Sequence, residues 1–131
     1  MGAFSDYLEN KIIDHTLRNT TFTAPATVYI ALFTSTASNA QLEANTLTNE
    51  VTGGSYARQS AAFSAASGGS TSNTGTVTFS NLPATTLGYA AIMDASTAGN
   101  ILYYVQLSAP VTVGAGDSFQ INTSGFTVQL D

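Results

Sequence analysis

The feature that most constrains the fold is a succession of short strand-like segments between residue 56 and the end of the chain. They are YARQSAAF (56–63), GTVTFSNL (75–82), LGYAAIMD (87–94), NILYYVQL (100–107), PVTV (110–113), SFQI (118–121) and FTVQLD (126–131). Gly, Asn, Ser and Pro residues fill the gaps, as turns require. In the second segment Val77 and Phe79 alternate with Thr76, Thr78 and Ser80, which is the period of a strand with one buried face. About seven strands of this length predict an all-β domain, a β-sandwich or jelly-roll-like fold.

Two further segments lie before this series. TVYIALFT (27–34) is continuous, β-branched and aromatic, so we expect it to be the central strand, buried on both faces. Residues 35–55 are polar and lack either period, which predicts a long loop of the kind that is usually functional or tied to a neighbour. The low-complexity SAASGGSTSN (64–73) is predicted to be a bend.

The N-terminal stretch differs chemically from the rest, because residues 6–18 hold five of the eleven charged side chains. Ser5 is a suitable N-cap, and acidic residues early with Arg18 late suit the helix dipole, so a helix is predicted over about residues 5–18. Two apolar stripes follow from the helical period. One stripe consists of Phe4, Leu8, Ile12 and His15. The other stripe, nearly opposite on the helix, consists of Ile13 and Leu17. Such a helix can contact two surfaces.

The length and the charge of the chain limit the functions that it can have. The 131 residues suit a single domain, with residues 1–20 as helix and arm and residues 26–131 as the sandwich that carries the 35–55 loop. Only 8% of residues are charged, against about 25% in ordinary soluble domains, which favours a subunit of a larger assembly. Three scattered basic residues make no phosphate-binding patch, so we expect no nucleic-acid partner. No apolar run suits a membrane span and no signal peptide is recognisable, so no membrane contact is expected and the protein should be made in the cytoplasm.

The residues that could carry out catalysis do not form a pattern typical of an enzyme. His15 is the one histidine, and on an apolar flank it is expected to be packed or interfacial. There is no nucleophile-elbow motif and no cysteine. The acids of the β region, Glu43, Glu50, Asp94 and Asp117, fall in or beside turns and loops, where Asp94 and Asp117 should bond nearby backbone N–H groups. We therefore predict no catalytic residue, no cofactor and no metal.

Arg58 and the tyrosines are candidate contact residues. Arg58, if buried, needs a carboxylate or several carbonyls, from a loop of the same or a neighbouring subunit. Tyr103 and Tyr104 should point to opposite faces of one strand, so that at most one joins the core. Tyr56 and Tyr103 suit a protein interface. A carbohydrate-binding groove remains the alternative.

The order of these landmarks resembles a known family. The chain is similar to small virion structural proteins of tailed bacteriophages. Five segments carry the resemblance: FSDYLENKIIDHTL, TAPATVYIALFT, GGSYARQSAAF, YAAIMDASTAGNILYYVQL and a closing VTVGAGDSFQINTSGFTVQLD. Some members of that group are capsid cement or decoration proteins, and others are labelled tail-fibre proteins. None of the matching segments holds a catalytic motif.

The resemblance implies a non-enzymatic virion protein. With a compact domain and no fibre-shaft repeats, we expect a capsid decoration protein on the capsid surface, which clamps neighbouring major capsid protein subunits and stabilises the shell. It would also contact copies of itself, with a trimer suggested by analogy. The expected partner interface consists of Leu8, Ile12, Ile13, Leu17, Tyr56, Arg58 and Tyr103. The alternative is a tail-tip or tail-fibre-associated module that recognises host surface carbohydrate.

Overall fold

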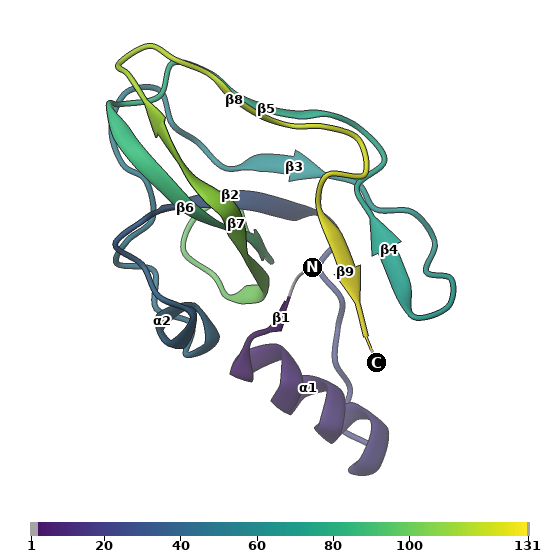
Figure 1. The fold of residues 1–131 in the computed structure, drawn as a ribbon. Coiled ribbons are helices and arrows are strands. Elements are labelled where there is room, and N and C mark those ends of the chain that lie inside the picture. Colours follow the sequence, from purple (N-terminus) through teal and green to yellow (C-terminus); the bar gives the residue numbers. More distant parts are fainter. Residues whose placement is uncertain (1–2, 131) are drawn as a thin grey trace.

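A computed structural model of the chain describes residues 3–130. Its elements in chain order are β1 (Ala3–Phe4), α1 (Asp6–Leu17), β2 (Val28–Thr34), α2 (Asn39–Glu43), β3 (Gln59–Ala61), β4 (Ser70–Ser72), β5 (Val77–Phe79), β6 (Thr85–Met93), β7 (Ile101–Val113), β8 (Phe119–Ile121) and β9 (Thr127–Gln129). The prediction of an all-β fold with one longer helix at the N-terminus is confirmed (Figure 1).

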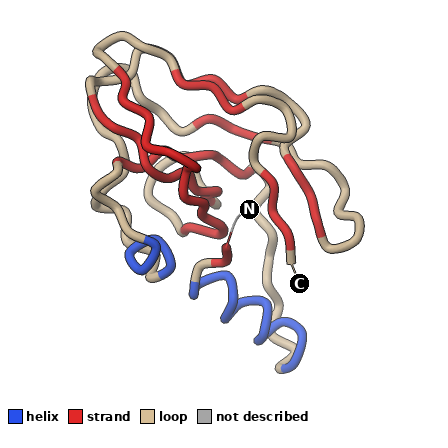
Figure 2. Tube along the Cα trace, viewed as in Figure 1, coloured by secondary structure: helices blue, strands red, loops and turns tan. Residues whose placement is uncertain are grey.

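Every strand pairing among the described residues is antiparallel. Five strands form one sheet in the order β1-β7-β6-β2-β3, and β4 pairs with β9 and β5 with β8 in two short ribbons. Figure 2 shows both helices near one end of the molecule, away from β5 and β8. The segments predicted at 87–94 and 100–107 form a hairpin, the β6–β7 pair, which contributes the longest register in the sheet.

The five-stranded sheet has an apolar cluster on each face. Ile30 and Leu32 of β2 pack into one cluster, while Ala31 and Phe33 pack into the other, and all four side chains are buried. The strand predicted from TVYIALFT is therefore buried on both faces as expected. It is not the central strand, however, because β6 occupies the middle of the sheet and β2 lies one place further out.

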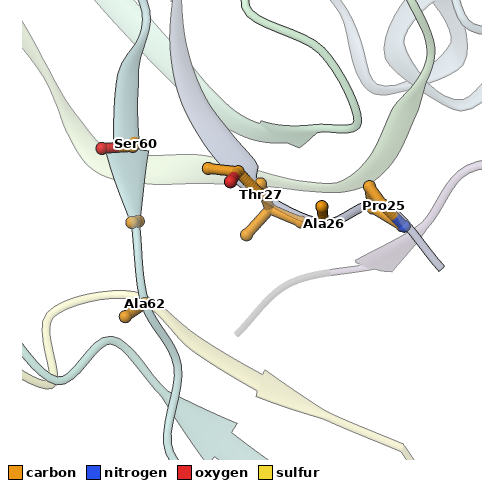
Figure 3. A pocket seen from close by; sticks show the side chains of 7 residues that line it. Pro25, Ala26, Thr27, Ser60 and Ala62 are labelled. Atoms are coloured by element: carbon orange, nitrogen blue, oxygen red, sulfur yellow. The ribbon is translucent and has the colours of Figure 1, made fainter.

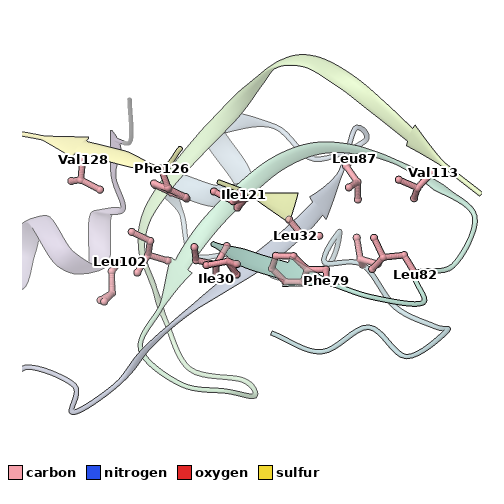
Figure 4. Packing of buried hydrophobic residues seen from close by; sticks show 14 of the residues in the cluster. Ile30, Leu32, Phe79, Leu82, Leu87, Leu102, Val113, Ile121, Phe126 and Val128 are labelled. Atoms are coloured by element: carbon pink, nitrogen blue, oxygen red, sulfur yellow. The ribbon is translucent and has the colours of Figure 1, made fainter. Parts of the chain in front are cut away.

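The larger cluster fills the space between the sheet and the two ribbons. Leu102, Phe126 and Val128 lie at one end of it and Leu82 and Val113 at the other (Figure 4). Full burial of one such side chain stabilises the fold by about 1.5–3 kcal/mol. This two-layer packing agrees with a sandwich, while jelly-roll connectivity stays a prediction.

A β-bulge changes which way the tyrosines of β7 point. The register shifts between Ile92 and Met93 of β6, so two successive β7 residues, Leu102 and Tyr103, both pack on the larger cluster. Tyr104 then joins the cluster on the opposite face. The prediction that the two tyrosines face opposite ways is confirmed, but both contact apolar clusters, because each face of this sheet carries one.

The 35–55 loop is not uniformly irregular. It contains α2, which starts with a complete capping box: the Ser38 side chain accepts from the Gln41 N–H, and the Gln41 side chain accepts from the Ser38 N–H. Leu42 is fully buried against the sheet. The loop prediction was wrong here, because the Ser-x-x-Gln spacing that signals a helix start stood in a segment without apolar periodicity.

Two other boundaries differ from those expected. The segments predicted at 100–107 and 110–113 belong to one strand, β7, with Pro110 inside it. The bend predicted at 64–73 contains β4, which pairs with β9 near the C-terminus. A low-complexity sequence gives no local signal for a strand that depends on a distant partner.

Candidate assembly interface

The start of α1 is anchored to β7 through Ser5, which is fully buried. Its hydroxyl accepts a hydrogen bond from the Leu8 N–H at 3.3 Å and donates one to the Ile101 carbonyl. Its own N–H donates to the Leu102 carbonyl at 3.0 Å. The predicted helix and its Ser5 cap are therefore confirmed, and the same residue fixes the helix to the sheet.

The two apolar stripes of α1 meet different environments. Leu8 is 4% exposed and Ile12 is half-buried, and both pack on the larger cluster. Ile13 is 52% exposed and Leu17 is 80% exposed. The opposite orientation expected from the helical period is confirmed. We call Ile13 and Leu17 the outer stripe.

A small, mostly apolar hollow adjoins the outer stripe. It has a volume of about 170 Å³ and is lined by Phe4, Glu9, Ile12 and Ile13. Phe4 in turn packs edge-on against Tyr103, with ring centroids 5.0 Å apart. Exposed apolar side chains beside such a hollow form a surface that another protein can cover.

His15 is exposed, so it is not packed within the chain, and its place at an interface stays a prediction. Its Nδ1 atom accepts a hydrogen bond from the Phe22 N–H at 3.2 Å and lies 3.3 Å from the Thr20 carbonyl oxygen. Because Nδ1 accepts in that bond, the imidazole proton belongs on Nε2. His15 therefore orders the chain as it leaves α1.

Arg58 fastens three segments of the chain together. Its guanidinium donates to both carboxylate oxygens of Glu50, at 2.7 and 2.8 Å, and to the carbonyls of Ala95 and Ala98, at 2.9 and 2.7 Å. The hydrogen bonds to Glu50 raise the pKa of Arg58 further. The expectation that Arg58 needs a carboxylate or carbonyls is met within one chain, by the 35–55 loop and the β6–β7 turn.

Tyr56 belongs to the same cluster. Its hydroxyl donates to Glu50 at 2.9 Å and accepts from the Leu32 N–H at 3.0 Å. Burial and the neighbouring Glu50 carboxylate raise the pKa of Tyr56 far above its usual range. Since the Arg58 side chain is only 4% exposed, this cluster leaves little for a partner to contact.

Tyr103 lines an apolar groove of about 230 Å³ between the five-stranded sheet and β9. The other lining residues are Val28, Phe63, Thr71, Ile92, Leu102 and Val128. Burial raises the pKa of the Tyr103 phenol. A second, more open pocket of about 550 Å³ lies where β2 begins and β3 ends, and none of its lining residues is charged (Figure 3).

The predicted roles of two acids are confirmed. Asp94 accepts from the Asn100 N–H at 2.7 Å, and Asp117 accepts from the Gly114 N–H at 2.7 Å, so both stabilise turns. Within residues 3–130, no group of three His, Cys, Asp or Glu side chains could hold a metal ion. No helix in the same range is long and apolar enough to cross a membrane.

Comparison with known proteins places the chain in a family. No curated protein matches it. A family model described as podophage GP4 fiber I protein gp80 matches residues 3–129, which is nearly the whole chain. The chain therefore belongs to this Gp80 family of phage structural proteins.

Proposed function

We propose that the chain is a non-enzymatic structural subunit of a phage virion that attaches to a second virion protein through the outer stripe of α1. Membership in a phage fibre family supports the virion role. The observation that carries the attachment surface is the exposure of Ile13 and Leu17 on a helix whose first turn is fixed to the sheet by Ser5.

The mechanism is burial of apolar area without any reaction. Ile13 and Leu17 project from a helix that is already ordered, so docking costs little further conformational entropy. Covering Leu17 would gain about 1.5–3 kcal/mol, and covering Ile13, which is already half-buried, would gain about half as much. A subunit that binds the assembled particle and not its dissociated parts stabilises the particle by mass action.

The family description favours a fibre as the place of attachment. Tyr56 and Tyr103, which a carbohydrate site would use, are engaged inside the chain. This favours a structural subunit at the fibre over a module that binds host carbohydrate.

Capsid decoration is the second candidate, with the major capsid protein and copies of the same chain as partners. Its support is the shape of the domain. Residues 3–130 pack in two layers around one larger and one smaller apolar cluster, as a clamp on a shell requires, and do not form an elongated shaft.

The location is tested by labelling intact virions with gold-conjugated antibody against the purified protein and imaging them by electron microscopy. Gold at the fibres is the expected result. Gold distributed over the capsid would favour decoration instead. Virions that carry no label, from a phage shown to express the protein, would overturn the virion role itself.

A further inference from the structure

The hollow beside the outer stripe is built from elements that the fold already fixes. Phe4 pairs with Tyr103 in the ladder between β1 and β7, and the two rings pack edge-on. Ile12 is half-buried against the larger cluster, and the start of α1 is held to the sheet by Ser5. Because these walls are ordered in advance, filling the hollow costs little conformational entropy.

The lining of this hollow is apolar except for one acid. Of the four lining residues, Phe4, Ile12 and Ile13 are apolar and the fourth is Glu9. Glu9 and Ile13 are four residues apart on α1, so they are neighbours on the surface of the helix. Glu9 is exposed, which leaves its carboxylate in contact with water. The hollow thus combines apolar walls with one negative charge at its rim.

Glu9 has no cationic partner in the described chain, since it forms no ion pair among residues 3–130. The helix dipole favours acids in the first turn of a helix, where Glu9 stands. It favours them on every side of the helix, however, and so it does not select the side that carries an apolar hollow. The position of Glu9 beside the outer stripe points to a cation from outside the chain.

A second copy of the chain is a poor source of that cation, because its basic side chains are already engaged. Lys11 lies over the Tyr7 ring, 5.7 Å from the centroid. Arg18 and Arg58 each pair with a carboxylate of their own chain. The sequence has no other Lys or Arg, against eight Asp and Glu. Charge complementarity therefore favours a different protein as the occupant.

We propose that the hollow receives the side chain of a lysine or arginine from the virion protein to which the chain attaches. The aliphatic stem of that side chain would pack on the apolar walls, and its charged head would pair with Glu9 at the rim. The volume of about 170 Å³ suits such a stem, since a cavity of about 150 Å³ holds a benzene molecule. This inference rests on the proposed attachment for the identity of the partner, and it adds a basic residue to the apolar contact at Ile13 and Leu17.

The test uses butylguanidinium as the probe, with the full chain observed by NMR at low salt. Butylurea is its uncharged match, and guanidinium is the same cation without the stem. Saturable amide shifts at Phe4, Glu9 and Ile13 are expected, with butylguanidinium binding several-fold more tightly than either match. Glu9→Gln should weaken butylguanidinium binding several-fold, as loss of a surface ion pair does. Equal affinity for the three probes, or no saturable shift at these residues, would overturn the inference.

Glu43→Gln is the matched control, because it removes the same charge from an exposed acid on α2 that does not line the hollow. It should leave butylguanidinium binding unchanged. Equal weakening in Glu43→Gln and Glu9→Gln would show an effect of net charge alone and would contradict the proposed pairing.

Virion attachment separates this inference from the proposed function. Leu17 does not line the hollow, so Leu17→Asp should bind butylguanidinium normally while failing to attach to virions. Normal attachment of that variant would count against the outer stripe and not against the hollow. Glu9→Lys should attach to virions more weakly than Glu43→Lys. Equal attachment of those two variants would count against a basic residue in the partner and not against the outer stripe.

Discussion

Leu8 and Leu17 lie on the same helix and face opposite environments, since Leu8 is 4% exposed and Leu17 is 80% exposed. The inner residue packs on the main apolar cluster, and the outer one contacts no cluster within the described chain. One short helix therefore serves the fold on one side and offers an apolar surface on the other.

This division predicts that the two stripes respond differently to substitution. Leu8→Ala should lower the free energy of unfolding by about 2–5 kcal/mol, because it leaves a cavity in the core. Ile13→Asp and Leu17→Asp should change it by no more than about 0.5 kcal/mol, as exposed positions do. Urea denaturation followed by circular dichroism measures all three. Comparable losses in the outer and inner variants would mean that the outer stripe belongs to the fold.

The cluster around Arg58 predicts that loss of this one charged side chain strongly lowers the free energy of unfolding. Arg58→Ala leaves Glu50 with the Tyr56 hydroxyl as its one remaining side-chain donor and removes the donor to two turn carbonyls, so the free energy of unfolding should fall by about 3–5 kcal/mol. The matched control is Arg18→Ala, which removes an exposed ion pair to Asp14 at 3.2 Å and should cost about 0.5 kcal/mol or less. Similar values for the two variants would show that the cluster adds nothing beyond a surface pair.

The raised pKa of Tyr56 predicts that the folded protein loses stability at alkaline pH. Its pKa is raised by burial and by Glu50, so the folded chain keeps a proton that the unfolded chain releases above about pH 10. Stability should therefore be unaffected by this group below about pH 9 and should fall as the pH rises through 10. Tyr56→Phe should be less stable at neutral pH, having lost two hydrogen bonds, but should show a shallower alkaline decline. Equal slopes for both proteins would exclude Tyr56 as the cause.

The conformation of Gly54, in the tight turn before β3, predicts that a larger residue at this position destabilises the fold. Its φ is +57°, and a Cβ atom there would lie 2.5 Å from the Asn81 carbonyl oxygen, so Gly54→Ala should destabilise the fold by more than about 1 kcal/mol. Gly75 is the control, because a Cβ at that position meets nothing within 4 Å. Gly75→Ala should be neutral or slightly stabilising by thermal denaturation. A harmless Gly54→Ala would show that the turn can relax.

Local signals in the sequence predicted much of the fold. Ser5 and the charges around it predicted α1, and the alternation at Val77 and Phe79 predicted the buried face of β5. What local signals could not give was pairing over long distances. The register of β4 with β9, and the place of β6 at the centre of the sheet, depend on contacts between segments far apart in the chain.

The same limit applies to the interface. The helical period predicted that Ile13 lies opposite Leu8, and the chemistry of a guanidinium predicted the kind of partner that Arg58 needs. The identity of that partner, Glu50, required the path of the 35–55 loop. The packing of α2 on the sheet through Leu42 was missed, because α2 itself was not expected.

The most direct test of the account is attachment of the purified protein to virions that lack it, measured by co-sedimentation. Wild-type protein should bind saturably, and the double variant Ile13→Asp with Leu17→Asp should not, although it should remain folded. A double variant that binds as well as wild type would contradict the claim that the outer stripe of α1 attaches this subunit to the particle.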